Sequence, residues 1–270
     1  MSSTFKDKLK NSLMPNGWLH AAPNSSALNP HEQWIVALGS FTWSYLGDYV
    51  NAFESEDDAS TCAAALEQWW GVSDTDSYRQ RAQGLISQGQ RSEFQPLVDL
   101  ISDFRSVASN ISGIRKLKVG FFPTSIVSYY YKQSNTSFKA SMKDLGMGSQ
   151  ELTEMLMMCS GYGEGDDFGE FLEDFAQVKS ALAWDAVRVV HMSSLAYSAG
   201  YVSRGEAMQY SSQLKSQVEE TYTDWRNAAA GYVLGAWLWD RTDTRLDNIS
   251  RTTSMLLKDP ESLVNQVAFK

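Results

Sequence analysis

The sequence predicts an all-α protein, built as a single compact multi-helix domain. The chain has 270 residues, 43% of them hydrophobic and 20% charged, which is the balance of a globular protein with a substantial core. Apolar residues recur at intervals of three and four in segment after segment, the period of a helix with one buried face. Helix start and stop signals flank these segments, and strand-like alternation is scarce. We therefore expect about eight or more helices around one core.

The N-terminal part predicts an arm followed by a well-capped helix. Residues 1–28 are rich in Ser, Asn and Pro and lack periodicity, so we expect a flexible arm there and a single helical domain over residues 29–270. Asn29 suits the N-cap of the first helix, because Pro30 then takes its first position and Glu32 completes a capping box.

Further helices are predicted through the first half. The apolar period of the first one continues to Ala52, and "ESEDDAS" then introduces a second helix that ends at Gly71. A third follows, with Gly89 just beyond its end as a left-handed residue. "SEFQPLVDLISDFRSVASNI" keeps helical spacing. The segment 111–150 is aromatic and β-branched, and we favour a helix after Pro123 over a strand.

The second half contains the longest predicted helix. "SQELTEMLMMCSG" has helical spacing, and "GYGEGDDFGEF" is predicted to be a surface loop. One long helix is then expected over residues 171–199, with Gly200 as its stop, and we expect it to be the buried centre of the fold. Ser203 opens the next helix through the capping box of "SRGE", and Thr223 and Asp259 are expected to cap two later ones.

An acid, a base and a histidine share one side of this central helix. At about 100° per residue, Asp185, Arg188 and His191 form one stripe, and the same side carries large apolar residues without Lys or Glu between them: Trp184, Met192 and Leu195. The stripe is therefore expected to be at least partly buried. Asp185 and Arg188 are spaced to pair, and a structural ion pair is the interpretation we favour. The alternative is a clamp for an anionic ligand with His191 as acid/base, which predicts a pocket reaching these atoms.

A second candidate region is the helix after Asp224. Its large rings alternate with Ala and Gly, a pattern that lets a neighbouring helix approach between aromatic walls. A packed helix crossing is the commoner cause, but the rings on both helices are also ligand-pocket candidates: Trp184, Trp225, Tyr232 and Trp239. Buried indole N–H and phenol O–H groups need partners, and Asp185 is a candidate partner for them.

Carboxylates crowd the predicted loop that precedes the central helix. Six of them fall within residues 161–174, and they are candidate contacts for a basic partner: Glu164, Asp166, Asp167, Glu170, Glu173 and Asp174. Their spacing is not that of an EF-hand loop, and a solvated loop is the commoner reading.

Composition excludes several classes of function. A net charge of −9 argues against a general nucleic-acid-binding surface. The most apolar run, 228–239, is too short to span a membrane, and the first residues lack the apolar core of a secretion signal. With two separated cysteines, three histidines and no phosphate-loop or metalloprotease motif, we expect no metal, no cofactor and a reducing cytoplasmic location.

Several segments together resemble the bacterial domain-of-unknown-function family 1266. They are "AWDAVRVVHMSSLAYSAGYVSRGEAMQY", "TYTDWRNAAAGYVLGAWLW" and the upstream "WWGVSDTDSYRQRAQGLISQGQRSEF". In the last segment Gln90 stands where the family pattern has a histidine, which argues against an essential reaction at that position. The resemblance implies a bacterial, intracellular, mostly helical protein and names no reaction.

Two hypotheses of function follow, from different classes. The first is a non-enzymatic protein-binding module, such as an immunity or inhibitor protein that masks a basic toxin surface, because the chain is acidic and lacks catalytic motifs. The rival is an enzyme or a receptor for a small anionic ligand, centred on Asp185, Arg188 and His191. A homo-oligomeric scaffold is a third alternative.

Overall fold

The computed structural model describes residues 19–23, 27–109, 127–128, 130, 148–159, 169–240 and 246–270. Every regular element in these ranges is a helix, so the predicted all-α class is confirmed. Residues 1–18 and 24–26 of the predicted arm lie outside the described residues. The short piece between them is docked, since Leu19 is buried and Ala22 exchanges two hydrogen bonds with the Asn51 side chain. The division into an arm and one domain stays a prediction.

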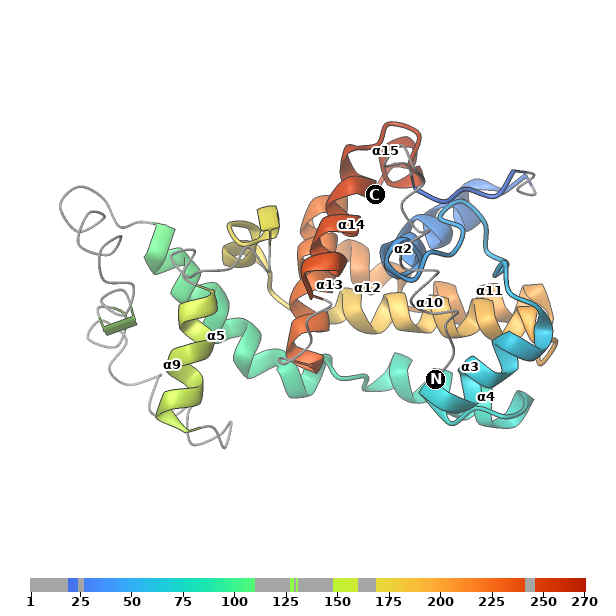
Figure 1. Cartoon of the computed structure of the whole chain (residues 1–270), viewed down its shortest axis with the longest axis horizontal. Coiled ribbons are helices and arrows are strands. Elements are labelled where there is room, and N and C mark those ends of the chain that lie inside the picture. Colours follow the sequence, from blue (N-terminus) through green and yellow to red (C-terminus); the bar gives the residue numbers. More distant parts are fainter. Residues whose placement is uncertain are drawn as a thin grey trace.

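Figure 1 shows helices stacked around α10, with α5 and α9 extending away from that stack. In chain order the α-helices are α2 (Pro30–Leu46), α3 (Ala59–Trp70), α4 (Thr75–Ser87), α5 (Arg91–Ser109), α9 (Ser149–Met158), α10 (Leu182–Ser198), α11 (Arg204–Ser212), α12 (Lys215–Thr221), α13 (Trp225–Trp239), α14 (Leu246–Lys258) and α15 (Leu263–Gln266). Two short 3₁₀ turns, η1 (Gly169–Phe171) and η2 (Asp174–Gln177), precede α10.

The first helix confirms its predicted start and corrects its predicted end. The Asn29 side chain accepts from the backbone of His31 and Glu32, and Glu32 accepts from the Asn29 backbone, which completes the capping box. The helix does not run on to Ala52. It stops at Leu46 because Gly47 adopts a left-handed conformation, and Ala52 contributes its apolar side chain to the core from a loop.

The next two helices end as predicted. Asp58, within "ESEDDAS", caps α3, and Gly71 follows its last residue with φ +65. Gly89, two residues beyond the end of α4, has φ +56. This left-handed residue turns the chain back across α10, and the turn that it makes shapes the site described below.

The central helix is shorter than predicted. Instead of one helix over 171–199, α10 begins at Leu182, and the residues before it form η1, η2 and an extended connection at Val178. The apolar spacing misled the prediction, because Phe171, Phe175 and Val178 are all buried without belonging to one helix. The Tyr222 hydroxyl fixes the helix start by accepting from the Ala183 N–H and donating to the Ser180 carbonyl. Gly200 stops the helix with φ +78.

The position of α10 is the one expected for it. The helix contacts α2, α3, α4, α11, α12 and α13, and 13 of its 17 residues are buried. Because it is covered on all sides, any charged group on it must find partners inside the protein.

The C-terminal third differs from the prediction mainly in its caps. Ser203 caps α11 as expected, but Asp224 rather than Thr223 caps α13, and Ser262 rather than Asp259 precedes α15. Helix α14, Leu246–Lys258, was not predicted at all. It packs against α2 and α13, and its buried face is rich in Ser and Thr, which hide the usual apolar signal.

Helices α5 and α9 lie beside each other, where Arg105 donates to the Cys159 carbonyl and forms an ion pair with Glu173. The predicted helix after Pro123 falls mostly outside the described residues; 127–128 and 130 are helical. No helix of the described ranges is both long enough and apolar enough to cross a membrane.

Candidate functional site

The turn between α4 and α5 is organised around the buried carboxylate of Asp185. This side chain is 0% exposed. It accepts from the Gln90 backbone N–H at 3.0 Å on both oxygens and from the Arg91 backbone N–H at 3.0 Å. The turn leaves no space for a side chain at Gly89, where a Cβ would lie 2.0 Å from Oδ2 of Asp185. The carboxylate thus does for this turn what an N-cap does for a helix.

Arg91 is the main cationic partner of Asp185. Its Nη1 lies 3.2 Å from Oδ2 of Asp185 and also donates to the Leu85 carbonyl, while Nη2 donates to the Ile86 carbonyl. One guanidinium therefore joins the carboxylate to the open C-terminal carbonyls of α4. The sequence predicted a buried ion pair at Asp185, but the closer partner is Arg91, since Arg188 lies at 3.9 Å.

Arg188 sits in a box of three tryptophans one turn further along α10. Its guanidinium carbon lies 4.8, 5.3 and 5.0 Å from the ring centroids of Trp70, Trp184 and Trp239. Nη1 donates to the side-chain oxygen of Gln90. Burial lowers the pKa of Arg188 to about 10, against the opposing pull of Asp185, so the group stays charged at neutral pH. Cation–π contact in a partly dry site offsets part of the cost of burying that charge.

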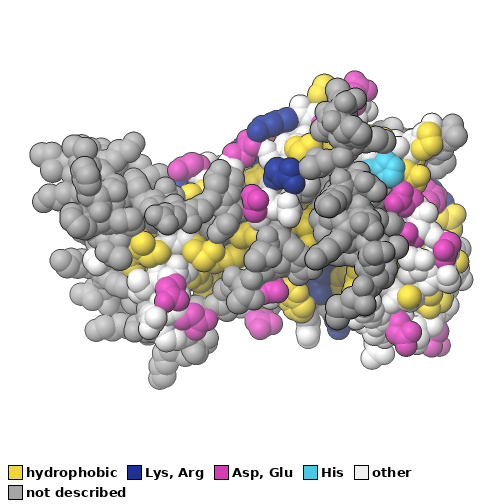
Figure 2. Space-filling view, in the orientation of Figure 1, with side chains coloured by type: hydrophobic (Ala, Val, Ile, Leu, Met, Phe, Trp, Pro, Cys, Tyr) yellow, Lys and Arg dark blue, Asp and Glu magenta, His cyan; other side chains and the backbone are white. Residues whose placement is uncertain are grey.

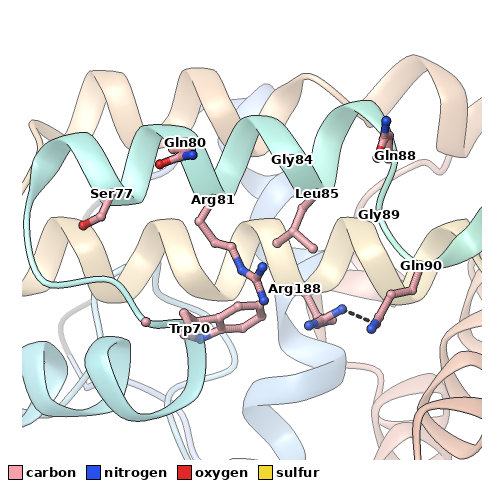
Figure 3. A pocket seen from close by; sticks show the side chains of 11 residues that line it. Trp70, Ser77, Gln80, Arg81, Gly84, Leu85, Gln88, Gly89, Gln90 and Arg188 are labelled. Carbon is pink, nitrogen blue, oxygen red and sulfur yellow. Dashed lines mark hydrogen bonds between the residues drawn. The ribbon is translucent and has the colours of Figure 1, made fainter.

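A cavity of about 590 Å³ opens beside Arg188, between α4 and the α3–α4 loop (Figure 3). The volume falls in the range typical of small-molecule sites. One face of α4 supplies most of the wall, and Trp70 and Gly71 come from the end of α3: the lining is Trp70, Gly71, Ser77, Gln80, Arg81, Gly84, Leu85, Gln88, Gly89, Gln90 and Arg188. The part of the wall that is described carries two cations and no carboxylate.

Arg81 reaches down from α4 toward Trp70 and Arg188 (Figure 3). The two guanidinium groups are close enough for Arg81 to lower the pKa of Arg188 further. Arg81 takes part in none of the ion pairs formed within the described chain. The indole N–H of Trp70 is buried and has no hydrogen-bond partner among the described residues. The cavity therefore gathers two positive charges, and Arg81 has no ion-pair partner among the described residues.

His191 lies away from this cavity. Its Nδ1 accepts from the Trp43 indole at 3.2 Å, and the half-exposed ring of Trp69 stacks over it. Its Nε2 is buried and has no hydrogen-bond partner among the residues that the structure describes. Burial lowers the pKa of His191 to about 4, so the ring is neutral near pH 7. The structure thus separates the three residues of the predicted stripe: only Arg188 lines the cavity, Asp185 is buried behind it, and His191 faces α2 and α3.

The aromatic pocket candidates divide into two pairs. Trp184 and Trp239 flank Arg188, and Trp239 is 52% exposed at the surface. Trp225 and Tyr232 instead lie in the core. Trp225 packs on other rings and donates to the Val267 carbonyl.

The small residues between these rings serve a helix crossing, as the sequence also suggested. A Cβ at Gly235 would lie 2.4 Å from Cβ of Trp184, so α10 and α13 touch there. The idea that Tyr232 or an indole satisfies Asp185 is wrong, because the bonds to its carboxylate come from the turn at 90–91.

Sequence reasoning missed Arg81, Trp70 and Gln90 as site residues. Helical spacing places four cavity residues on one face of α4: Ser77, Arg81, Gly84 and Gln88. The polar composition of that face is typical of an ordinary solvent-exposed surface.

Three of the six acidic partner-binding candidates are described, and all three bind the chain's own cations. Glu170 pairs with Arg226 and Lys258, Asp174 with Arg226, and Glu173 with Arg105. Glu164, Asp166 and Asp167 lie outside the described residues. The described side chains offer no group of three or more potential metal ligands, and burial raises the pKa of the Cys159 thiol to about 12.

The fold and site define an all-α protein with a cationic, tryptophan-lined cavity against its central helix. A family model described as "Protein of unknown function (DUF1266)" matches residues 65–269, and the chain belongs to this family. The match includes both walls of the cavity, α4 and α10. No curated protein and no solved structure matches the chain.

Proposed function

We propose that this protein is a receptor for a small anionic ligand, held in the cavity by Arg81 and Arg188. The observation that carries the proposal is the cavity of about 590 Å³ whose described lining contains two arginines and no carboxylate. Proteins rarely gather like charges in a recess without a counter-charge, because each lowers the other's affinity for its proton and for the site. An anion in the recess would supply that counter-charge.

The free donors support binding of an oxyanion in particular. Within the described chain the Arg188 guanidinium makes one hydrogen bond, to Gln90, and Arg81 forms no ion pair. A buried donor without a partner costs about 1–3 kcal/mol. A carboxylate or phosphoryl group would satisfy several of these donors at once through short, charge-assisted hydrogen bonds.

Binding accounts for the geometry better than catalysis does. A general acid or base must reach the reacting atom, and the two titratable candidates do not line the cavity. Asp185 is committed to the 90–91 turn, and His191 is turned toward Trp43. The groups at the cavity are donors and cations, which bind and orient a ligand without exchanging protons at neutral pH.

The test is a panel of carboxylate, sulfate and phosphate salts at constant ionic strength, read as a shift in melting temperature. Ligands that bind only the folded state raise it. We expect at least one class of oxyanion to stabilise the wild type and to lose that effect in Arg81→Gln. The matched control is Arg251→Gln, which removes the same charge from the exposed face of α14. Equal responses of the two variants and the wild type to every salt would refute the proposal.

The protein-binding hypothesis is retained as a second candidate because the chain has a net charge of −9. An immunity or inhibitor role would use an acidic surface, and the described acidic side chains are scattered over the face in Figure 2. Glu170, Glu173 and Asp174 already pair within the chain, so a basic partner would have to compete for them or use other carboxylates. A pull-down from the native host at low salt that yields no stoichiometric partner would count against it.

A further inference from the structure

We infer that the ligand is a phosphate monoester with a hydroxylated, polar body, and not a simple carboxylate. This inference rests on the proposed function and names the class of ligand for the same cavity. It is carried by three features of the wall: its charge, the way Arg188 is presented, and the polar face of α4.

The first feature is charge. Arg81 and Arg188 bring two positive charges to one recess, and Arg81 disfavours the charged form of Arg188. A single carboxylate would leave one of them unmatched. A phosphate monoester carries between about −1.5 and −2 at pH 7 and offers three acceptor oxygens. It therefore neutralises both arginines and still has an oxygen for a further donor of the wall, such as the side-chain amide of Gln80 or Gln88.

The second feature is the orientation of Arg188. Three tryptophan rings stand within 5.3 Å of its guanidinium carbon, so they occupy much of the space around the group. Nη1 donates to Gln90, and the other N–H groups are the ones left for a ligand in the cavity that Arg188 lines. A guanidinium presented edge-on forms two parallel hydrogen bonds with a carboxylate or phosphoryl group. The rings also hold the group in place, which reduces the entropy lost on binding.

The third feature is the rest of the wall. Gln80 and Gln88 line the cavity from α4, and Gln90 adds the N–H₂ of its amide from the turn. Ser77 also lines the cavity, but its hydroxyl is engaged by Ser73 and Asp74 in the cap of α4. Leu85 and Trp70 are the large apolar members of this lining. Hydroxyl and amide groups bind hydroxyls well, and they give little affinity for a hydrocarbon chain. Such a wall fits the body of a sugar phosphate or a similar polyol phosphate.

A substitution at Gly84 can fill the cavity without disturbing the fold. It lies inside α4, lines the cavity, and a Cβ built on it meets nothing within 4 Å. Gly84→Leu should therefore fold at least as stably as the wild type, because Leu favours a helix more than Gly does, and should fill the space that a ligand needs. Gly205→Leu is the matched control: this glycine also has open space around its Cβ, in α11, and does not line the cavity.

The experiment measures binding of glucose 6-phosphate, glucuronate, glucose and inorganic phosphate by calorimetry at neutral pH. The first three share a ring and differ only in the group at the end. We expect glucose 6-phosphate to bind about tenfold or more tightly than glucuronate, since one extra charge-assisted hydrogen bond is worth that much. Glucose should not bind measurably. Binding should be lost in Arg81→Gln and Gly84→Leu, and kept in Arg251→Gln and Gly205→Leu.

The possible results separate the two proposals. Glucuronate binding as tightly as glucose 6-phosphate, in the same variant-dependent way, would overturn the phosphate assignment and leave the anion receptor standing. Inorganic phosphate binding without any gain from the sugar would overturn the hydroxylated body. If no oxyanion of any class binds the wild type, the receptor itself is refuted.

A pH series adds an independent arm. The charged groups that face the ligand are Arg81 and Arg188, with Asp185 and Arg91 behind them. Arg188, with a pKa of about 10, does not titrate between pH 5 and pH 8. The second proton of a phosphate monoester does, near pH 6. Affinity for glucose 6-phosphate should therefore fall as the pH is lowered through about 6, and affinity for inorganic phosphate should fall near its own second pKa. A flat profile would contradict recognition of the dianion.

Discussion

Asp185 and Arg188 lie one turn apart on α10, yet their surroundings differ in kind. Asp185 is enclosed by donors at 3.0–3.2 Å, two of them backbone N–H groups. Arg188 lies among tryptophan rings and beside a cavity that it shares with another arginine. The carboxylate of Asp185 therefore has close partners within the chain, whereas on our proposal the two arginines gain theirs from a ligand.

If the proposed function holds, this difference separates a charge that serves the fold from a charge that serves ligand binding. A buried charge that serves the fold has all its partners within the chain, because an unanswered charge is costly. A buried charge that serves binding keeps some of its hydrogen-bonding groups free for the ligand. The rest of the fold must then offset the free energy lost by burying them. Both charges would be classed together by sequence spacing or by burial alone, so the partners decide the matter.

The largest expected effect is at Asp185. Asp185→Asn keeps the shape but turns one acceptor oxygen into a donor that faces the N–H groups of the 90–91 turn and the Arg91 guanidinium. Removing one partner of a buried ion pair costs about 3–5 kcal/mol, and we expect a loss of that size in the free energy of unfolding by urea. Asp76→Asn is the control, since its side chain is 93% exposed, and should cost far less. Similar losses in both would contradict the structural role of Asp185.

Replacing glycine by alanine at two positions should change the free energy of unfolding in opposite directions. Gly89→Ala places a Cβ 2.0 Å from Oδ2 of Asp185 at a residue with φ +56, so we expect it to lose more than about 2 kcal/mol of stability. Gly84→Ala, five positions earlier in the same wall, meets open space inside a helix and should gain about 0.5–1 kcal/mol. Urea denaturation of both variants checks this, and a loss of stability in Gly84→Ala would contradict the open space beside Gly84.

The sequence predicted most of the local features and few of the distant ones. Helix caps such as Asn29, Asp58 and Ser203 depend on neighbours within four residues, so their signals are complete in the sequence. Helix α14 was missed because its buried face carries Ser250, Thr252 and Thr253, whose hydroxyls read as exposed.

The site shows the same limit more sharply. The stripe on the central helix was predicted to be buried, and it is. Its partners were not predicted, because Asp185 is held by backbone N–H groups about a hundred residues away, and a backbone N–H has no signature in a sequence. Nothing in the sequence distinguishes Arg81 from other charged residues on a helix, and only the packing of α4 on α10 brings it beside Arg188.

His191, the third member of the stripe, should make the stability of the protein depend on pH. Its folded-state pKa, lowered by burial to about 4, lies below the value of about 6.5 for an exposed histidine. The unfolded chain therefore binds a proton first as the pH falls, and stability that is complete above about pH 6.5 is lost progressively down to about pH 4. We expect a loss of about 2 kcal/mol between pH 7 and pH 5 that His191→Asn removes, because Asn can still accept from Trp43. His31→Asn, at an exposed position, is the control; a slope that survives in His191→Asn would assign it to other groups.

The smallest expected effect is at Arg81, and its sign is informative. Arg81 is exposed and joins no ion pair within the described chain, and its positive charge repels that of Arg188. Without a ligand, Arg81→Gln should therefore leave the free energy of unfolding unchanged or raise it by about 0.5 kcal/mol or less. The gain should shrink in high salt, which screens the repulsion. Arg188→Gln should instead destabilise, because it empties the tryptophan box and breaks the contact with Gln90. A clear loss of stability in ligand-free Arg81→Gln would mean that the fold itself depends on this arginine. Arg81 would then be a structural charge like Asp185, and the contrast between the two regions would not hold.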